Sequence, residues 1–597
     1  MSKYYIDYNR NKNFTTFGLT TLKDRYLSLK SNTSNEKEDP QEMFARIASA
    51  YADDIEHEVR LYNYMSNFWF MPATPILTNA GTTRGLPISC FLNEVQDNIN
   101  GIAKTYNENI YLASSGGGIG TNWSNVRGIG EQIVNKGNSS GIMPFLKVAD
   151  SMSLAISQGG IRRGSSAQYL HISHPEIEEF IDVRRPTGDN NRRSLNIHHG
   201  IVIPDEFMQK VKNGEMWQLK SPKTGKVVSE VSAQELWIKI LTARVETGEP
   251  YLLFIDNVNK YTPEHHKKLG LNVKTSNLCS EITLPTGIDH LGKERTAVCC
   301  LSSVNLIHYK DWENDINFIP DIMRFLDNVL EDFINKAPNE IERAKYSAMR
   351  ERSVGLGVMG FHSFLQSQNV PFEGVMAQSW NKRIFKHLKT ECDKISKKLA
   401  IEKGSCPDAK DAGIIERFSY KIAIAPTANI SNICGEASPG IEPSAANVFT
   451  QKTLSGSFTI KNKYLQNLLQ SKGYNTEEIW SSIATQEGSV QHLDFLTPIE
   501  KEVFKTAFEL NQEWIIEHAA DRTPFVCQAQ SVNLFLLSDV SKKVLNAIHF
   551  NAWKKGVKSL YYCRSRSKQR ADKVSQKITT NNLNINENKY EECLACQ

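Results

Sequence analysis

The stretch from about residue 70 to 310 constrains the fold most. Short apolar runs alternate there with Gly-, Ser- and Asn-rich loops and with helical stretches such as 233–247. Alternation of this kind is typical of an α/β barrel or an α/β sheet. Two of the loops stand out, SSGGGIG at 114–120 and QGGIRRGSSA at 158–167. The predicted fold class is therefore α/β.

Helical patterns flank this stretch on both sides. Residues 1–70 carry apolar residues at three- and four-residue intervals, on either side of a polar loop at 31–40. After residue 310, helices are predicted at 321–334, 340–352, 379–402 and 496–520, and strands at 421–425, 534–537 and 559–562.

The run NVKTSNLCSEITLPTG at 272–287 holds the most reactive group of side chains. It is short, apolar on both sides and closed by Pro and Gly, so it is predicted to be a strand. Alternate residues of a strand share a face, which would align Asn277, Cys279 and Glu281. A thiol beside a carboxyl and an amide indicates a nucleophile or radical carrier next to a general base. The alternative is a buried core cysteine with two polar neighbours.

Composition limits the classes of protein that remain. The net charge is +4 over 597 residues, which is too weak to indicate nucleic acid as a partner. No apolar run is long enough for a membrane span, and the N-terminus has no signal core. The eleven cysteines are sparse, as in proteins of reducing compartments. We therefore expect the protein to be located in the cytoplasm, or in the host cytoplasm if the protein is viral.

The C-terminal segment 567–597 is polar and rich in Asn, and it is predicted to be a flexible tail. It ends in Cys593 and Cys596, a CxxC pair. Such a pair is either half of a zinc site or a thiol–disulfide exchange pair. No second pair of ligands follows nearby, which favours exchange. No metal site is predicted, because the pairs His198–His199 and His265–His266 lack metal-ligand spacing.

Several further motifs are weaker when taken singly. Cys90, Cys299 and Cys300 lie in apolar runs typical of a core, and Tyr561 and Tyr562 form a pair on a predicted strand. The SSGGGIG loop lacks the dinucleotide spacing but suits the approach of a ligand phosphate. The run PTANISN at 426–432 is a second candidate phosphate loop, in which Thr427 and Asn429 offer side chains.

Together these motifs resemble the large, catalytic subunit of class I ribonucleotide reductase over nearly the whole chain. The resemblance rests on FGLTTLKDRYL at 17–27, ATPILTNAG at 73–81, LPISCF at 86–91, SNLCSEI at 276–282, AVCCLS at 297–302, GIEPSAANVFT at 440–450, LSGSF at 454–458, SLYY at 559–562 and the terminal cysteine pair. It implies an N-terminal helical domain and a ten-stranded α/β barrel of two five-stranded halves. A finger loop inside the barrel would present the thiol, where strict strand alternation need not hold.

The resemblance implies a role for each chemical group. Cys279 matches the transient thiyl radical that takes the 3′ hydrogen of the ribose. Glu281 matches the general base at the 3′ hydroxyl, and Asn277 matches the residue that orients the same region by hydrogen bonding. Cys90 and Cys299 match the redox pair, with Cys300 adjacent to the second member. Tyr561 and Tyr562 match the tyrosines that pass the radical inward. Cys593 and Cys596 match the tail pair that reduces the site again.

The resemblance also implies ligands and partners. Substrate contacts would come from Thr74, Ser89, Gly118, Thr427, Ala428, Asn429, Ile430 and Ser431, with Ile430 acting through its backbone. Effector contacts would come from Asp97, Asn98, Ile99 and Arg127 at a homodimer interface and from Arg162 and Arg163 in the loop 158–167. No cofactor is expected on this chain, because a metal-containing small subunit supplies the radical. Thioredoxin or glutaredoxin, nucleoside diphosphates and dNTP or ATP effectors complete the expected partners, without nucleic acid or membrane.

The expected domains are a helical domain at 1–70, a catalytic barrel at 71–566 and the tail at 567–597. Since the helical pattern begins by about residue 17, we expect no N-terminal ATP cone and no dATP shut-off through one. Two other enzymes share the barrel. A cobalamin-dependent reductase would not need the tyrosine pair, and a glycyl-radical reductase would need a C-terminal glycyl sequence. A degenerate, non-enzymatic homologue would have lost cysteines that are all present here.

Overall fold

The computed structural model describes residues 5–30, 36–88, 90–133, 137–158, 162–163, 165–435, 437–453, 456–537 and 539–566. Helices α1 (Thr16–Arg25), α2 (Pro40–Tyr51) and α3 (Ile55–Ser66) follow a 3₁₀ turn at Tyr8–Asn13. Asp39 begins α2 in a capping box with Glu42, and Pro40 fills the first turn. The helices predicted in the first seventy residues are confirmed, and α2 packs on α3 through a shared apolar core.

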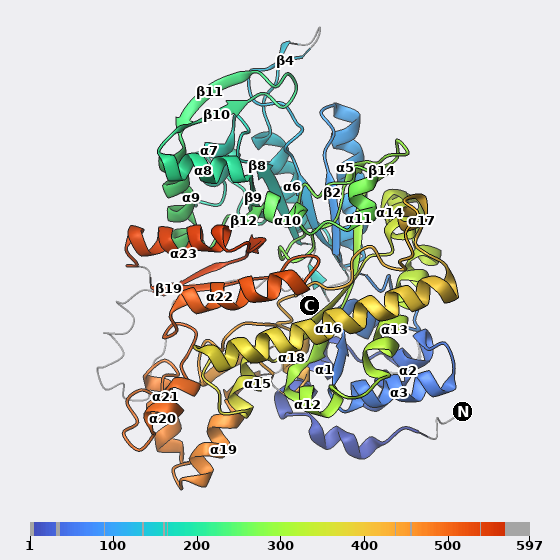
Figure 1. Cartoon of the computed structure of the whole chain (residues 1–597), viewed down its shortest axis with the longest axis vertical. Coiled ribbons are helices and arrows are strands. Elements are labelled where there is room, and N and C mark those ends of the chain that lie inside the picture. Colours follow the sequence, from blue (N-terminus) through green and yellow to red (C-terminus); the bar gives the residue numbers. More distant parts are fainter. Residues whose placement is uncertain are drawn as a thin grey trace.

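Five parallel strands form the first half of the barrel. In sheet order they are β2 (Cys90–Glu94), β3 (Gly118–Asn122), β8 (Ser165–His171), β9 (His198–Ile203) and β12 (Tyr251–Phe254). The crossovers include α5 (Ile99–Ser114), α6 (Met143–Ala155), α7 (Ile177–Ile181), α8 (Asp205–Asn213) and α9 (Ala233–Thr247). The hairpin of β10 (Met216–Lys220) and β11 (Val227–Ser232) precedes α9, and it lies at the outer edge of the molecule in Figure 1.

The second half is less regular. Strand β15 (Ala297–Asn305) pairs in parallel with β16 (Val354–Met359), and β16 continues to residues 421–425 through a parallel bridge between Leu356 and Ile422. Ile424 bridges Gln530 in the same sense, and β19 (Leu534–Leu537) pairs in parallel with β21 (Cys563–Arg566). Single bridges therefore replace the predicted strand at 421–425, whereas the strand at 534–537 is confirmed.

The two halves meet in antiparallel pairs. β15 runs antiparallel to β2, and β20 (Ser559–Leu560) runs antiparallel to β12. The first half has five strands. The second is built from five extended segments, β15, β16, 421–425, 528–537 and 559–566, of which 421–425 is joined to its neighbours by single bridges. β1 (Phe70–Pro72) extends β15 at its far end. The predicted fold of two five-stranded halves with an N-terminal helical region is confirmed.

Long helices cover the second half. α13 (Phe318–Lys336) and α16 (Val375–Lys403) pack together, and α16 crosses the middle of the view in Figure 1. Apart from those of the outlying lobe, the other described α-helices from residue 255 onward are α10 (Ile255–Asn259), α11 (Glu264–Lys268), α12 (Tyr309–Trp312), α14 (Glu342–Glu351), α15 (Phe361–Ser367), α17 (Pro407–Asp411), α18 (Ile430–Ile433), α22 (Gln512–Arg522) and α23 (Lys542–Lys554).

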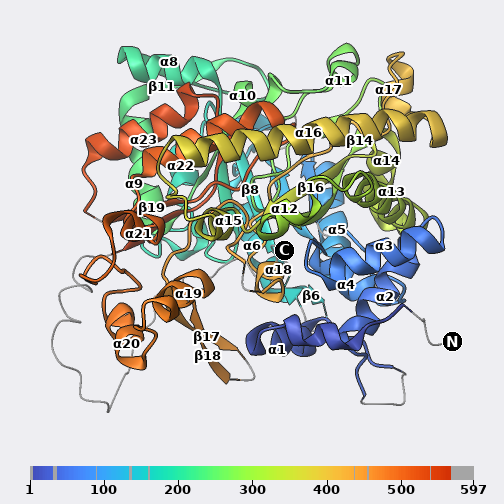
Figure 2. The ribbon, with the colours of Figure 1, turned by 60° about the horizontal axis from the view of Figure 1, so that its bottom comes forward.

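A small separate core supports an outlying lobe. The hairpin of β17 (Val448–Thr453) and β18 (Gly456–Lys461) leads into α19 (Lys463–Ser471), α20 (Glu477–Thr485) and α21 (Pro498–Val503), which lie together at one edge in Figure 2. The single helix predicted at 496–520 is wrong. It is two helices, because Thr497 caps α21 and Asn511 caps α22. None of the helices in the described ranges has the length and apolar character needed to cross a bilayer.

Candidate active site

Residues 272–287 form a finger loop inside the barrel and not the predicted strand. An isolated antiparallel bridge joins Val273 to Pro285, and the chain turns at its tip, where Ser280 has φ of 63°. The tip is closed by the amide of Ile282, which donates to Asn277 Oδ1 at 3.1 Å. A residue with positive φ interrupts a strand, so the alternation predicted for this run does not hold. Leu278 accordingly packs in the same apolar cluster as Cys279, although it was expected on the opposite face.

Strands β3 and β8 of the first half of the barrel contact the finger. A Cβ added at Gly120 of β3 would lie 1.8 Å from the carbonyl oxygen of Ser276, so only glycine leaves room for the loop. Tyr169 of β8 donates its hydroxyl to the carbonyl of Asn277 at 2.7 Å. Gly120 therefore leaves space for the finger, and Tyr169 binds its backbone.

Cys279 lies at the tip of the finger and is 3% exposed. It packs in one apolar cluster with Tyr169, Tyr251 and Tyr561. In this structure Cys279 is disulfide-bonded. The enclosed setting suits a reactive species that must be kept from water and stray reductants.

Glu281 is a fully buried carboxyl close to Cys279 in the chain. Burial raises its pKa to about 7, while hydrogen bonds from Asn277 and Ser531 oppose that rise. Ser531 Oγ lies 3.2 Å from Glu281 Oε2. A carboxyl with a pKa near neutrality can take up and return a proton at working pH, which is what a general base requires.

Cys90 and Cys299 face each other where the two halves of the barrel meet. They are paired positions of β2 and β15, and neither is in a disulfide. Opposite residues of antiparallel strands have Cα atoms about 4.5–5.5 Å apart, within the range that a disulfide spans. Cys300 is the next residue of β15 and points to the other face. The arrangement therefore favours Cys299 over Cys300 as the partner of Cys90.

Two amides contact these sulfurs. Asn277 Nδ2 lies 3.8 Å from Cys90 Sγ, and Gln528 Nε2 donates to Cys299 Sγ at 3.4 Å. Burial raises the pKa of Cys299 well above its usual range, and the hydrogen bond from Gln528 opposes this shift. The sulfur is accordingly held as a neutral thiol, able to give up a proton and an electron together.

Tyr561 and Tyr562 continue from Cys279 toward the second half. Their ring centroids are 4.2 Å apart, and the ring of Tyr251 lies 4.7 Å from that of Tyr561. Tyr561 is buried, whereas Tyr562 is partly exposed and its hydroxyl lies 3.3 Å from His198 Nδ1. The aromatic contacts form one line from the partly exposed ring to the cluster around Cys279.

The predicted phosphate loop runs into the short helix α18. Thr427 has φ of 55°, and its hydroxyl accepts a hydrogen bond from the amide of Gly440 at 2.7 Å. The amides of Ala428, Asn429 and Ile430 lie at the entry to α18, where backbone N–H groups can meet a phosphate. The hydroxyl of Ser431 is buried and has no partner among the described residues.

A cavity of about 380 Å³ extends from this loop to the tyrosines. Its lining includes Pro426, Ala428, Tyr561 and Tyr562. Two of the other predicted substrate residues lie on different elements. Thr74 begins α4 (Thr74–Asn79) and its hydroxyl is 3.2 Å from that of Tyr26, and Gly118 begins β3 as the paired neighbour of Cys90. Ser89 lies outside the described residues, as do Cys593 and Cys596 of the tail.

The predicted effector residues gather at the carboxyl end of β2. Arg127 holds Asp97 through both of its oxygens, with contacts of 3.0 and 2.8 Å. Asn98 caps α5, and Ile99 follows it with its side chain exposed. Arg162 and Arg163 form β7, which pairs with β6 (Ser157–Gln158) in a short hairpin.

Comparison with known families accounts for almost the whole chain. Residues 88–416 and 408–563 match the family described as "Ribonucleotide reductase, barrel domain", and residues 12–85 match "Ribonucleotide reductase, all-alpha domain". The chain is 40% identical to the ribonucleoside-diphosphate reductase large subunit of Invertebrate iridescent virus 3, an alignment that covers 96% of this chain and 97% of that one. The chain belongs to the ribonucleotide reductase large-subunit family.

Other relatives agree on the family. The large subunit of Arabidopsis thaliana is 31% identical over 94% of this chain and 77% of its own length. Among solved structures, the Actinobacillus ureae class Id ribonucleotide reductase alpha subunit matches with a TM-score of 0.82 and 33% identity, covering 93% of this chain and 98% of that one. The chain is therefore an oxidoreductase, a ribonucleoside-diphosphate reductase that serves deoxyribonucleotide synthesis.

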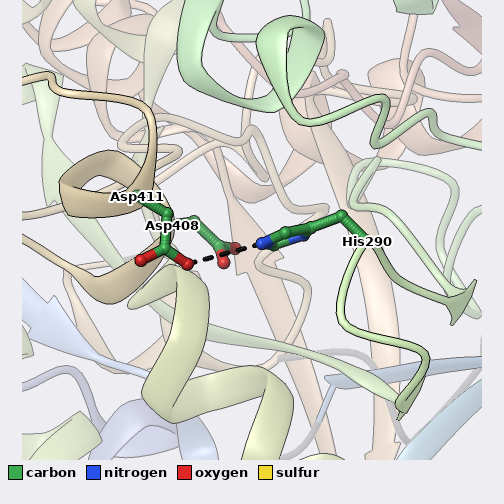
Figure 3. Close-up of side chains that lie close together, drawn as sticks. All are labelled: His290, Asp408 and Asp411. Carbon is green, nitrogen blue, oxygen red and sulfur yellow. Dashed lines mark hydrogen bonds and ion pairs between the residues drawn. The ribbon is translucent and has the colours of Figure 1, made fainter.

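A cluster of His290, Asp408 and Asp411 is the one grouping with metal-ligand geometry among the described residues (Figure 3). Two guanidinium groups already occupy its carboxylates. Arg295 contacts both oxygens of Asp408 at 2.6 and 2.9 Å, and Arg350 pairs with both aspartates. The positive partners hold the pKa of Asp408 far below its usual range. In this reductase the cluster is best explained as an ion-pair network on the outside of the barrel.

The sequence did not point to several residues that touch the site. Ser531 and Gln528 approach the finger and Cys299 from more than two hundred residues away. Tyr251 joins the tyrosine pair, and Glu249 is bound by His198, which in turn contacts Tyr562. The available signal was the polar run QAQS at 528–531, set between apolar residues where a central strand would be expected to be apolar throughout.

Proposed function

We propose that this chain reduces ribonucleoside diphosphates to 2′-deoxyribonucleoside diphosphates by thiyl-radical chemistry, with a small subunit that supplies the radical. The observation that carries the proposal is the pairing of Cys90 with Cys299 beside the finger loop. This pairing provides two electrons as a dithiol next to a third, separate cysteine. Glu281 and Asn277 belong to the same loop.

In the proposed reaction, the Cys279 thiyl removes the 3′ hydrogen atom while Glu281 takes the 3′ hydroxyl proton. The 2′ hydroxyl then leaves as water with a proton from the redox pair. Besides that proton, Cys90 and Cys299 supply two electrons and the hydrogen that C2′ gains, and they become a disulfide. Glu281 returns its proton to the 3′ oxygen, and Cys279 returns the hydrogen atom to C3′, which restores its thiyl. The pKa of Glu281 near 7 and the neutral thiol of Cys299 fit these proton movements.

The radical would arrive through Tyr562 and Tyr561. Their centroid separation of 4.2 Å permits transfer between adjacent rings, and Tyr561 shares a cluster with Cys279. A one-electron oxidant on the small subunit is the chemical source. No cofactor is assigned to this chain.

Substrate diphosphate would bind at Thr427, Ala428, Asn429, Ile430 and Ser431, mainly through backbone amides. Thr74, Ser89 and Gly118 would complete the pocket. Cys593 and Cys596 would reduce the Cys90–Cys299 disulfide by exchange and would be reduced in turn by thioredoxin or glutaredoxin.

Regulation is proposed at the carboxyl end of β2. A dNTP or ATP effector would contact Asp97, Asn98, Ile99 and Arg127, and the hairpin with Arg162 and Arg163 would relay its identity. Exposed apolar side chains of α5 and α6, including Ile99, Val148 and Leu154, support a homodimer through these helices. We also propose domains at 1–70, 71–566 and 567–597 and a cytoplasmic location, in the host if the protein is viral.

Reconstitution tests the proposal. CDP reduction with dithiothreitol is measured with and without a candidate small subunit, and turnover is expected only with it. Cys279→Ser should abolish turnover. Activity with adenosylcobalamin in place of the small subunit would contradict the proposal and favour a cobalamin enzyme.

A separate pair of assays tests the tail. The double variant Cys593→Ser, Cys596→Ser should keep turnover driven by dithiothreitol and lose turnover driven by thioredoxin. Equal loss in both assays would show that the tail is not a shuttle.

A further inference from the structure

Residues 528–531 run beside the finger loop without being part of it. The amide of Ala529 donates to the carbonyl of Glu281 at 2.8 Å, and the amide of Thr283 donates to Gln528 Oε1 at 3.3 Å. Lys558 fixes the start of this run, because its Nζ donates to the carbonyls of Val526, Cys527 and Gln528 at 2.7, 3.0 and 2.7 Å. The run therefore presents side chains to the finger from a well-held backbone.

Ser531 has two possible acceptors in the finger. Its Oγ lies 2.7 Å from the carbonyl oxygen of Cys279 and 3.2 Å from Glu281 Oε2, and the residue is buried. A hydroxyl has one proton to donate and two lone pairs to accept with. The Ser531 hydroxyl can therefore donate a full hydrogen bond to only one of these two oxygens at a time.

The protonation state of Glu281 decides which oxygen accepts the hydrogen bond from Ser531. When Glu281 is ionised, the carboxylate is the stronger acceptor and draws the Ser531 proton. When Glu281 has taken a proton, its own O–H can donate to Ser531 Oγ, and the Ser531 proton is then free for the carbonyl of Cys279. No proton leaves the pair of residues in this exchange of donors.

We propose that Ser531 is a positioning residue that couples proton uptake by Glu281 to a firmer hold on the backbone of Cys279. The proposal rests on the proposed roles of Glu281 as base and Cys279 as thiyl. The finger tip would be held most firmly after the base has taken the 3′ hydroxyl proton. That is the interval in which Cys279 must keep its hydrogen in place for return to C3′.

The test compares Ser531→Ala with Ser531→Thr, which keeps the hydroxyl, in the full chain with saturating small subunit. Ser559→Ala is the matched control. Ser559 is a buried serine on β20 whose Oγ donates to the carbonyl of Gln530 at 3.0 Å, with no carboxylate among its described hydrogen bonds. Ser531→Ala should shift the acid limb of kcat/KM upward by about 0.5–1 pH, since an ionised Glu281 loses a donor. Ser531→Thr should restore the limb, and Ser559→Ala should leave it in place.

A second readout does not depend on turnover. The thermal midpoint of Ser531→Ala should fall more at pH 8, where Glu281 is ionised, than at pH 5, whereas the loss in Ser559→Ala should not depend on pH. Shifts in both readouts support the proposal. A shift in midpoint without a shift in the rate profile would show that Ser531 binds Glu281 but that Glu281 is not the base, and the proposal then falls with that role. No pH-dependent change in either readout overturns the proposal while leaving the function itself untouched.

Discussion

The two halves of the barrel differ in regularity, and the difference follows the chemistry. In the first half, β2, β3, β8, β9 and β12 pair in continuous parallel ladders. In the second half, residues 421–425 are joined to their neighbours by single bridges. In the run 528–533, the amide of Ala529 donates to the finger at the carbonyl of Glu281, and the carbonyl of Gln528 accepts from Lys558 Nζ. A regular strand uses its backbone in the ladder, whereas an interrupted one has amides and carbonyls left to position reactive groups.

The largest expected effect is a difference in turnover between Tyr→Phe variants at two tyrosines of the same cluster. Tyr561→Phe, on the second half, should lower turnover by about 10³-fold or more, as loss of an essential member of a catalytic unit does. Tyr251→Phe, on the first half, should stay within about twofold, because Tyr251 packs beside the tyrosine pair and is not one of its two members. Steady-state CDP reduction measures both. Equal loss in the two variants would extend the radical path to the first half.

The next effect distinguishes neighbouring cysteines of β15. Cys299→Ser should lower turnover by about 10²-fold or more, because a serine can give up neither the electron nor the proton of the thiol. Cys300→Ser should retain most activity, since that side chain points away from Cys90. Turnover is measured together with mass-spectrometric detection of the Cys90–Cys299 disulfide in an arrested enzyme. A disulfide between Cys90 and Cys300 would contradict the assignment.

The pH dependence of stability provides a test that needs no substrate. Burial raises the pKa of both Glu281 and Glu351 to about 7. A carboxyl with a raised pKa in the folded state contributes stability that is present below its unfolded pKa and is lost as pH rises through the folded one. Replacing either residue by Gln should therefore improve apparent stability at pH 8 relative to pH 5, by about 3 kcal/mol at most. Urea denaturation at each pH measures this difference.

The same two variants differ in catalysis. Glu351 lies outside the site and accepts hydrogen bonds from Ser347 and Ser353 at 2.8 and 3.0 Å. Glu351→Gln should keep the wild-type pH profile of kcat/KM, whereas Glu281→Gln should lose the acid limb with most of the activity. An unchanged limb in Glu281→Gln would exclude that residue as the base.

Helices and strands were predictable from the sequence where the spacing of apolar residues within the element determines its bounds. The helix at 233–247 and the strand at 534–537 have the bounds that their periodicity predicts. The helix at 496–520 was predicted as one element, although Thr497 and Asn511 are both N-cap residues that mark two starts. Apolar spacing alone does not show this division, whereas the two capping residues do.

The site was predictable as a set of residues but not as a geometry. The finger was expected to be a strand, because its apolar flanks suit one. Its conformation instead depends on partners far along the chain, such as Gly120, Tyr169 and Ser531. The opposition of Cys90 and Cys299 likewise arises only where two separately formed halves meet. Contacts with such sequence separation leave no periodic signal within a window of ten or twenty residues.

The smallest expected effect is a difference in KM between two Ile→Val variants, one in each half of the barrel. Ile201 of β9 and Ile424 beside the phosphate loop are both fully buried, and Ile→Val at either site should cost about 0.5–1.5 kcal/mol of stability. Ile201→Val should leave KM for CDP unchanged, because a continuous ladder holds its backbone on both sides. Ile424→Val should raise KM about two- to fivefold, since one bridge joins the run into Thr427 to residue 530 and one lost methylene is worth about 1 kcal/mol. Urea denaturation and steady-state kinetics measure the two quantities. Equal KM values would mean that the irregular half is held as firmly as the regular one, so that the interruptions in its ladder do not affect how substrate is bound.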